Sequence, residues 1–176
     1  MNYLNDSFGL SLSIPREWVI VSAQQSSQIV DESKKILQAR DQSQQTQIEQ
    51  SIARSTTLLA LTKLPAGQPN NASFMLIAER IPSPQIRNGV DVIRAMENVM
   101  KGSNFNIEFQ GETRTERISN ADFAVATIKN SSPHGVFNQK IYVTVKNGFA
   151  LQFFFTYLDD ADLTPYDAIM KSVKLK

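Results

Sequence analysis

Cysteine is absent from the 176 residues, and histidine and tryptophan occur once each. The absence of cysteine excludes disulfide bonds, thiol catalysis and metal sites built on thiolates. It does not fix the compartment, because bacterial envelope proteins often lack cysteine. One histidine leaves a single candidate base of that type and no second imidazole ligand for a metal ion.

Long hydrophobic runs and long runs of charge are also missing. No segment approaches the roughly 18 apolar residues of a membrane-spanning helix. The formal net charge is +1, and the lysines and arginines form no run. We therefore expect neither a nucleic acid nor an acidic membrane as partner. No glycine-rich phosphate-binding motif occurs, so no cofactor is predicted.

The start of the sequence leaves two explanations open. No signal peptide precedes Asn2, and Met1 leads almost directly into a predicted strand. Either the protein is cytoplasmic, or an export signal has been removed and Met1 stands in its place.

The pattern of the chain predicts one α+β domain that covers residues 1–176. Alternating or continuous apolar residues predict strands, and i, i+3, i+4 spacing predicts helices. Short connections between the strands indicate an antiparallel sheet of about six or seven strands flanked by helices. The strands are expected at 8–14, 18–21, 57–64, 73–81, 105–118, 121–129 and 140–157, and the helices within 22–54, at 89–101 and from 164 onward.

Two helices carry end signals. Asn88 is a candidate N-cap for the helix 89–101, and Gly102 is placed to end it. Thr164 and Pro165 predict a cap followed by a first-turn proline. The polar segment 22–54 is expected to form two helical pieces, because 41–47 has no apolar residue and indicates a break.

The stretch 140–157 predicts a hairpin at the centre of the sheet. A two-residue turn at Asn147 and Gly148 would divide the apolar side chains between both faces. A three-residue loop, 146–148, pairs Val145 with Phe149 and puts them on one face. We therefore predict the three-residue loop, with Gly148 in the left-handed conformation of a bulge. Phe154 would then point to the other face, which indicates that this face is covered as well.

Both ends of the chain resemble one superfamily. The opening Phe-Gly-Leu-Ser-Leu-Ser-Ile-Pro-Arg-Glu-Trp at 8–18 is similar to the entry motif of Mog1/PsbP-like proteins. The segment 148–157, the acidic turn after it and the closing helix resemble the other end. The resemblance implies an antiparallel sheet between helices, an α/β/α sandwich, with Gly9 at a turn or close approach and Trp18 in the core. These are packing positions, so no member's functional residues are carried over.

Few residues are candidates for a catalytic or metal site. His134, beside Ser131 and Ser132, is the one possible histidine base, but the loop 130–135 favours a solvated turn. Asp159, Asp160 and Asp162 would suit Ca²⁺, yet the glycine and the distal glutamate of a calcium loop are missing. We interpret these acids as a solvated turn before a helix. No catalytic, cofactor-binding or metal-binding residue is predicted.

Two further segments have a functional and a structural interpretation. The glutamine-rich segment 42–50 could be a partner-binding surface, although a solvated helix face or a mobile loop is more typical of such a composition. The phenylalanines at 149 and 153–155 could line a ligand pocket, but aromatic strands of this kind usually form the core.

These observations favour a non-enzymatic binding or accessory domain with a protein partner. The resemblance is greatest to bacterial envelope members, many of them lipoproteins, which favours an exported location over a cytoplasmic one. The first alternative is a cytoplasmic chaperone for hydrophobic helices of a secreted protein, which requires an exposed apolar groove. The second is an enzyme, which requires clustered titratable groups in a pocket near His134 or 159–162.

Overall fold

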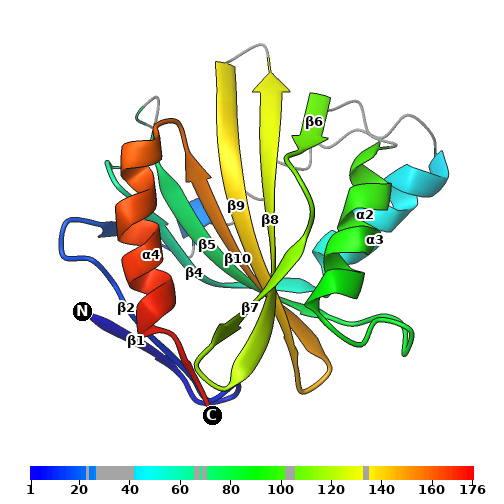
Figure 1. Cartoon of the computed structure of the whole chain (residues 1–176), viewed down its shortest axis with the longest axis horizontal. Coiled ribbons are helices and arrows are strands. Elements are labelled where there is room, and N and C mark those ends of the chain that lie inside the picture. The colour runs from blue at the N-terminus through cyan, green and yellow to red at the C-terminus, as the bar shows by residue number, and fades with distance from the viewer. Residues whose placement is uncertain (23, 27–41, 66–67, 69–70, 102–105, 133–134) are drawn as a thin grey trace.

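A large antiparallel sheet organises the fold (Figure 1). The computed structural model describes residues 1–22, 24–26, 42–65, 68, 71–101, 106–132 and 135–176. The strand order of the large sheet is β3 (Val19–Ile20), β4 (Ser55–Thr62), β5 (Ser73–Arg80), β10 (Phe149–Tyr157), β9 (Gly135–Lys146), β8 (Ala121–Ser132) and β6 (Asn106–Phe109), with β7 (Arg114–Ile118) also paired to β8. A small second sheet contains β1 (Asn2–Asn5), β2 (Leu10–Ser13) and β11 (Lys174–Leu175).

Helices lie on both faces of the large sheet, as the α+β prediction required. On one face, α4 (Leu163–Ser172) and the small sheet contribute to one hydrophobic core. On the other face, α3 (Gly89–Lys101) covers β8 and β9, and α2 (Gln42–Arg54) lies beside it. Figure 1 shows α4 on one side of the strands and α2 with α3 on the other. The large sheet has eight strands where six or seven were predicted.

The end signals of α3 are confirmed where the structure describes them. The helix covers the predicted residues, and the Asn88 side-chain oxygen accepts a hydrogen bond from the Asp91 N–H at 3.0 Å. This bond satisfies one of the N–H groups that a helix start leaves without a partner. Gly102 lies outside the described residues.

The packing roles predicted for Gly9 and Trp18 are also confirmed. Gly9 has a φ of +58°, and a side chain there would come within 3.2 Å of Lys176. Trp18 is buried, and its ring meets the Tyr166 ring edge-on, with centroids 5.5 Å apart. The entry segment is therefore fixed to the closing strand and helix at two points.

The central hairpin differs from the prediction. Lys146 pairs with Phe149, so Asn147 and Gly148 form a two-residue turn, with φ of 51° and 78°. Two successive positive φ values are typical of the tight hairpin turn whose twist matches that of the strands. The predicted three-residue loop is wrong, and Val145 faces Ala150 instead of Phe149.

The reason for this difference is that both faces of β9 and β10 are buried. Ile141, Val143 and Ala150 pack in the core on the α3 side. Leu151, Phe153 and Phe155 pack in the core on the α4 side, and each is fully buried. The rule that apolar residues share one face applies to a sheet with one wet face, so it did not apply here. The predicted placement of Phe154 on the second face is confirmed.

The predicted break at 41–47 is wrong for the residues that the structure describes. Helix α2 begins at Gln42 and continues to Arg54 without interruption. Glutamine is a good helix former, and the Gln45 side chain donates to Glu49 at 3.0 Å, one turn later. The first turns of this helix contain no buried side chain, and Ile48 is its buried residue. Any helical piece at 27–41 lies outside the described residues.

The hairpin turn gives a direct test of the observed register. We expect Asn147→Val to lower the free energy of unfolding by about 1–3 kcal/mol, because a β-branched side chain disfavours positive φ. Asn147→Gly should be close to neutral, since glycine adopts this conformation freely. Urea unfolding of both variants checks this. Equal stability of the two variants would contradict a positive φ at this position.

Tyr166 predicts a loss of stability at alkaline pH. Burial, and then the negative charge of Asp162, raise the pKa of its hydroxyl above the ordinary value. The folded state therefore retains a proton that the unfolded chain releases above about pH 10. The resulting stability is present below that pH and is lost as the pH rises further.

The measurement is the urea unfolding free energy at about pH 8 and at about pH 11. Wild type should lose more stability between these conditions than Tyr166→Phe. Tyr3→Phe, which alters a half-buried tyrosine of β1, should follow the wild type. The same pH dependence in all three proteins would rule out this role of Tyr166.

Candidate functional site

The histidine and its neighbouring serines do not form a described site. His134 lies outside the described residues. Ser131 pairs with Val136, and Ser132 pairs with Gly135, as β8 and β9 continue to their connection. The two serines are therefore strand residues, and the predicted loop at 130–135 is shorter than expected.

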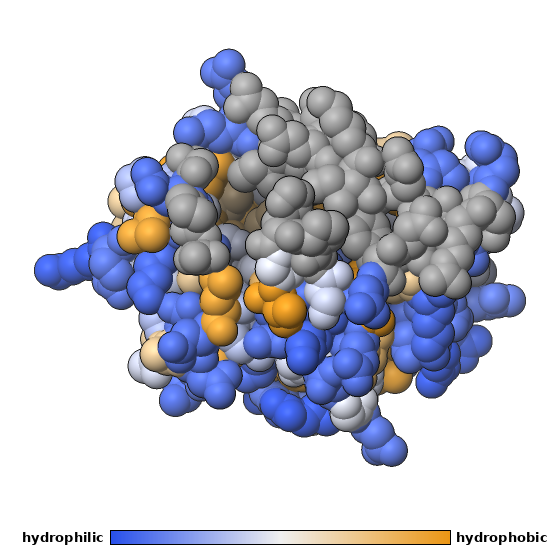
Figure 2. All heavy atoms as spheres, turned by 90° about the horizontal axis from the view of Figure 1, so that it is seen from above, coloured by the Kyte–Doolittle hydropathy of each residue, from blue (hydrophilic) through white to orange (hydrophobic). Residues whose placement is uncertain are grey.

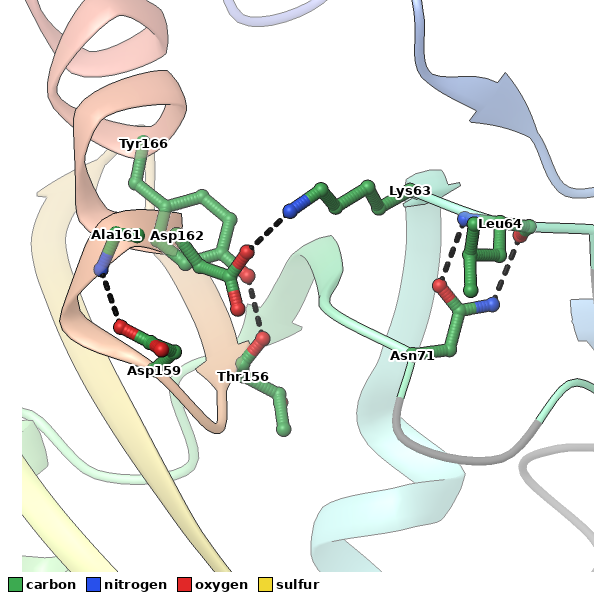
Figure 3. A network of polar contacts seen from close by, with 8 residues as sticks. All are labelled: Lys63, Leu64, Asn71, Thr156, Asp159, Ala161, Asp162 and Tyr166. Carbon is green, nitrogen blue, oxygen red and sulfur yellow. Dashed lines mark hydrogen bonds and ion pairs between the residues drawn. The ribbon is translucent and has the colours of Figure 1, made fainter.

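The three acids after β10 have separate structural roles (Figure 3). The Asp162 side chain is buried and accepts from the Lys63 ammonium at 2.6 Å. Asp159 accepts from the Ala161 N–H at 2.9 Å and caps the short helix Asp160–Asp162. The prediction of a wholly solvated turn is therefore wrong for Asp162. No group of three potential metal-ligating side chains occurs in the described part of the chain.

The short helix also changes the predicted start of α4. The helix begins at Leu163, with Asp162 at the cap position, and Pro165 follows within the first turn. Thr164 is therefore inside the helix and is not its cap. The predicted cap was wrong because the preceding helical turn, held by Asp159, leads the chain directly into α4.

The glutamine-rich segment 42–50 belongs to α2. Its Ile48 is buried, while Gln42, Gln47 and Gln50 are exposed. The end of the helix is held by the Glu79 carboxylate, which accepts from Ser51 at 2.8 Å and lies 3.6 Å from Arg54. These contacts support the interpretation of a solvated helix face, and a partner at this surface stays a prediction.

The phenylalanine cluster packs in the core of the described part of the chain. Phe155 stacks on Phe74 with ring centroids 4.8 Å apart and contacts Tyr166 at 4.6 Å. Phe153 and Phe155 have no exposed surface. The structural interpretation of this cluster is confirmed.

A cleft opens where two strands of the large sheet separate. β8 and β9 pair as far as Ala124 and Val143. Beyond this pair, 121–123 pair with β7 alone and 144–146 pair with β10 alone. The gap between the two strands is the centre of a cleft of about 400 Å³, which we call the fork cleft. Its lining residues are Arg87, Asn88, Gly89, Arg117, Asn120, Ala121, Asp122, Thr144, Val145, Lys146, Leu175 and Lys176.

The fork cleft collects residues from distant parts of the sequence. The loop before α3, the β7–β8 turn, the end of β9 and the last residues of the chain all contribute to it. In Figure 1 these segments all lie toward the lower end of the sheet. Its volume is within the range of small-ligand pockets, about 300–1,000 Å³.

Helix α3 begins directly at the fork. A side chain added at Gly89 would lie 2.1 Å from the Val143 carbonyl oxygen and 3.0 Å from the Ala124 side chain. These are the two residues at which β8 and β9 separate. Only glycine allows the helix start to approach the strand backbone so closely.

The charged side chains of the fork cleft are mainly cationic. Four of them are cationic and one, Asp122, is a carboxylate, which leaves an excess of three positive charges. Asp122 accepts from Arg117 at 2.8 Å, and Lys146 donates to the main-chain oxygen of Lys176. The Arg87 side chain is exposed and has no ion pair within the described residues. Arg87 is therefore free to meet a ligand.

Two uncharged donors also lie at the fork cleft. Thr144 is 3% exposed, and its hydroxyl has no hydrogen bond within the part of the chain that the structure describes. The Gly89 N–H comes before the first intrahelical hydrogen bond of α3 and likewise has no partner there. The fork cleft thus offers several donors, whereas its one carboxylate is already neutralised.

No pattern in the sequence indicated the fork cleft. Its residues come from four short segments that are distant in the sequence, 87–89, 117–122, 144–146 and 175–176, and none of these segments contains a ligand-binding motif. Arg117 lies in the densest basic patch, 114–117, but Arg114 of that patch is bound to Glu116 at 2.8 Å. Only the pairing of β8 with two different neighbours brings the residues together.

Three solved structures resemble the chain over nearly its whole length. Cyanobacterial PsbP (CyanoP) of Synechocystis sp. PCC 6803 has 13% sequence identity and a TM-score of 0.59, over 100% of this chain and 92% of that one. LpqN of Mycobacterium tuberculosis, described as involved in cell envelope biogenesis, has 14% identity and a TM-score of 0.50, over 100% and 91%.

The third structure is a protein of Bacteroides thetaiotaomicron VPI-5482, with 10% identity and a TM-score of 0.51. It matches 99% of this chain but 48% of its own length, so the chain spans about half of that protein. No family model and no curated protein matches the chain. The chain has the PsbP/Mog1-like fold, which confirms the resemblance of its two ends at the level of the fold.

The length and hydropathy of the helices bear on whether one of them could span a membrane. Among the described residues, none of the helices is long and apolar enough to span a bilayer. This agrees with the absence of a long hydrophobic run.

Gly89 gives a test of how the fork cleft is built. We expect Gly89→Ala to lower the free energy of unfolding by about 1–3 kcal/mol, because the added methyl group meets the Val143 carbonyl oxygen. An alanine inside an ordinary helix would instead stabilise by up to about 1 kcal/mol.

Urea unfolding measures this difference. Arg94→Ala, at an exposed position on the same helix, should stay within about 0.5 kcal/mol of wild type. A Gly89→Ala variant that is as stable as wild type would contradict the close approach.

Proposed function

We propose that the protein is a non-catalytic accessory domain that binds a protein partner at the bacterial cell envelope. The observation that carries this proposal is the chemistry of the fork cleft. The cleft contains hydrogen-bond donors and cations, while its one carboxylate, Asp122, is occupied by Arg117. Such a set of groups suits recognition, and its one carboxylate side chain is already paired and so is not a free general base.

The structural neighbours support the proposal. LpqN is described as involved in cell envelope biogenesis, and CyanoP is a cyanobacterial PsbP. Identities of 13–14% extend the fold to this chain and leave its function to be tested. The envelope location is part of the proposal, and a signal peptide encoded upstream of Met1 would support it.

The two alternatives have less support. A chaperone for hydrophobic helices needs a broad apolar surface. Both faces of the large sheet carry helices, and the fork cleft is polar. Figure 2 shows the other end of the molecule, where the hydrophobic residues of the described part form small separate groups between hydrophilic ones. An enzyme would need free titratable groups near 159–162, but Asp159 caps the short helix and Asp162 is in an ion pair with Lys63.

Site-specific photocrosslinking in the native host tests the proposal. A photoreactive amino acid at Asn120, an exposed residue of the cleft rim, should give one discrete crosslinked protein in the envelope fraction. The same group at Lys129, an exposed residue further along β8, serves as the matched control and should not give this product.

Two results would overturn the proposal. One is a crosslinking pattern that is the same from both positions or absent from both. The other is a hydrolytic turnover by the purified protein that His134→Ala abolishes.

A further inference from the structure

We propose that the fork cleft binds a phosphate group. This inference rests on the proposed function only in treating the cleft as a recognition site. The partner protein is a separate question, because the phosphate group is carried by a small molecule or by a lipid headgroup.

The charge of the fork cleft favours a dianion. Its side chains leave an excess of three positive charges, and Arg87 has no ion pair within the described residues. Lys146 can turn from the main-chain oxygen of Lys176 toward an anion, because the ammonium group ends a flexible side chain. A phosphate monoester carries a charge of about −1.5 to −2 near pH 7, more than one carboxylate.

The arrangement of the donors favours a tetrahedral anion. Arg87 and the Gly89 N–H come from the start of α3, Arg117 comes from β7, and the donors of β9 lie across the gap. A guanidinium group binds phosphate through two parallel hydrogen bonds. The first N–H groups of a helix add donors and a partial positive charge. Donors from several directions match phosphate oxygens better than the two oxygens of a planar carboxylate.

Thr144 is the observation that is independent of the helix start. Thr144 lines the cleft and is 3% exposed, and its hydroxyl makes no hydrogen bond within the described chain. The hydroxyl oxygen retains some accessible surface, since it is not one of the fully buried polar atoms that lack a partner in the described chain. A phosphate oxygen in the cleft would accept its hydrogen bond. The cavity of about 400 Å³ leaves room for the organic group that carries the phosphate.

Besides Asp122, the acidic side chain of Asp91 lies near the proposed site. The Asp91 carboxylate accepts from the Arg87 main-chain N–H at 3.0 Å and lies 3.7 Å from Arg94. It does not line the fork cleft, and its charge is balanced by Arg94. The Gly89 N–H and the Arg87 side chain are therefore available to the anion.

The test is a titration of the purified chain followed by amide NMR, at constant ionic strength balanced with sodium chloride. One arm uses inorganic phosphate and glycerol 3-phosphate. A second arm uses phosphatidylcholine vesicles with and without phosphatidic acid. We expect saturable changes at the amides of Gly89 and Thr144. A response to the soluble compounds indicates a free phosphate ester, and a response only to phosphatidic acid indicates a lipid headgroup. Either response supports the proposal.

Variants separate a built site from general charge attraction. Removing both cations in Arg87→Gln/Lys146→Gln should weaken binding by about tenfold or more, since charge-assisted hydrogen bonds are lost. Lys101→Gln/Lys129→Gln removes the same charge elsewhere and should leave binding unchanged. Thr144→Val should weaken binding severalfold, about the effect of one hydrogen bond, and Thr144→Ser should restore it.

The proposal is overturned if neither arm gives a saturable change, or if the two double variants bind equally. Retention of the amide spectrum in Thr144→Val shows that its fold is intact, so a loss of binding in this variant reports on the hydroxyl. Photocrosslinking at Asn120 that persists without phosphate binding would reject this inference and leave the proposed function standing. Phosphate binding without a crosslinked partner would support this inference and overturn the proposed function.

Discussion

The burial of the central hairpin on both faces is the constraint on which the rest of the structure depends. β9 and β10 carry apolar residues alternately toward α3 and toward α4. Each fully buried Phe or Leu side chain contributes about 1.5–3 kcal/mol relative to an exposed one. A shift of one strand by a single residue would turn every one of its side chains to the opposite face. The tight turn at Asn147 and Gly148 excludes that shift, so it holds both cores in register.

The two cores differ in composition. The core on the α4 side contains most of the aromatic rings, among them Trp18, Phe155 and Tyr166, in edge-on or tilted contacts. The buried residues of the core on the α3 side are aliphatic. A polar side chain lies on the same face, since Gln152 of β10 donates to Glu79 at 2.8 Å. Gln152 is 4% exposed, and this bond gives its buried amide nitrogen a partner. The polar chain from Gln152 through Glu79 to Ser51 and Arg54 fixes the end of α2 to the sheet.

The fork cleft follows from the same arrangement. β9 stays paired to β10 until the turn, whereas β8 leaves β9 at Ala124 to pair with β7. The helix start at Gly89 occupies the point of separation, and the backbone contact with Val143 sets its position. The cleft is thus a consequence of how the strands diverge, and the side chains that line it are positioned by paired strands and a capped helix. Such supports suit a site that binds without large rearrangement.

Local patterns predicted the local features of this fold. Helical spacing and an N-cap located α3, and the Gly9 and Trp18 motif predicted the entry segment, because these signals act over a few residues. The register of the hairpin was wrong, since the sequence does not show whether the second face of a sheet is wet. Asp162 appeared solvated for a similar reason, because its partner Lys63 is distant in sequence. The fork cleft could not be predicted, because it depends on which strand each end of β8 pairs with.

The most direct test of the two-sided hairpin is a measurement of cross-strand NOEs between α-protons. The register places Val145 opposite Ala150 and Val143 opposite Gln152, at pairs that exchange no hydrogen bonds, where the α-carbons are about 4.5 Å apart. Strong α-proton NOEs between these two pairs are the result that the account predicts. NOEs that connect Val145 with Phe149 and Val143 with Leu151 as opposed pairs would contradict it.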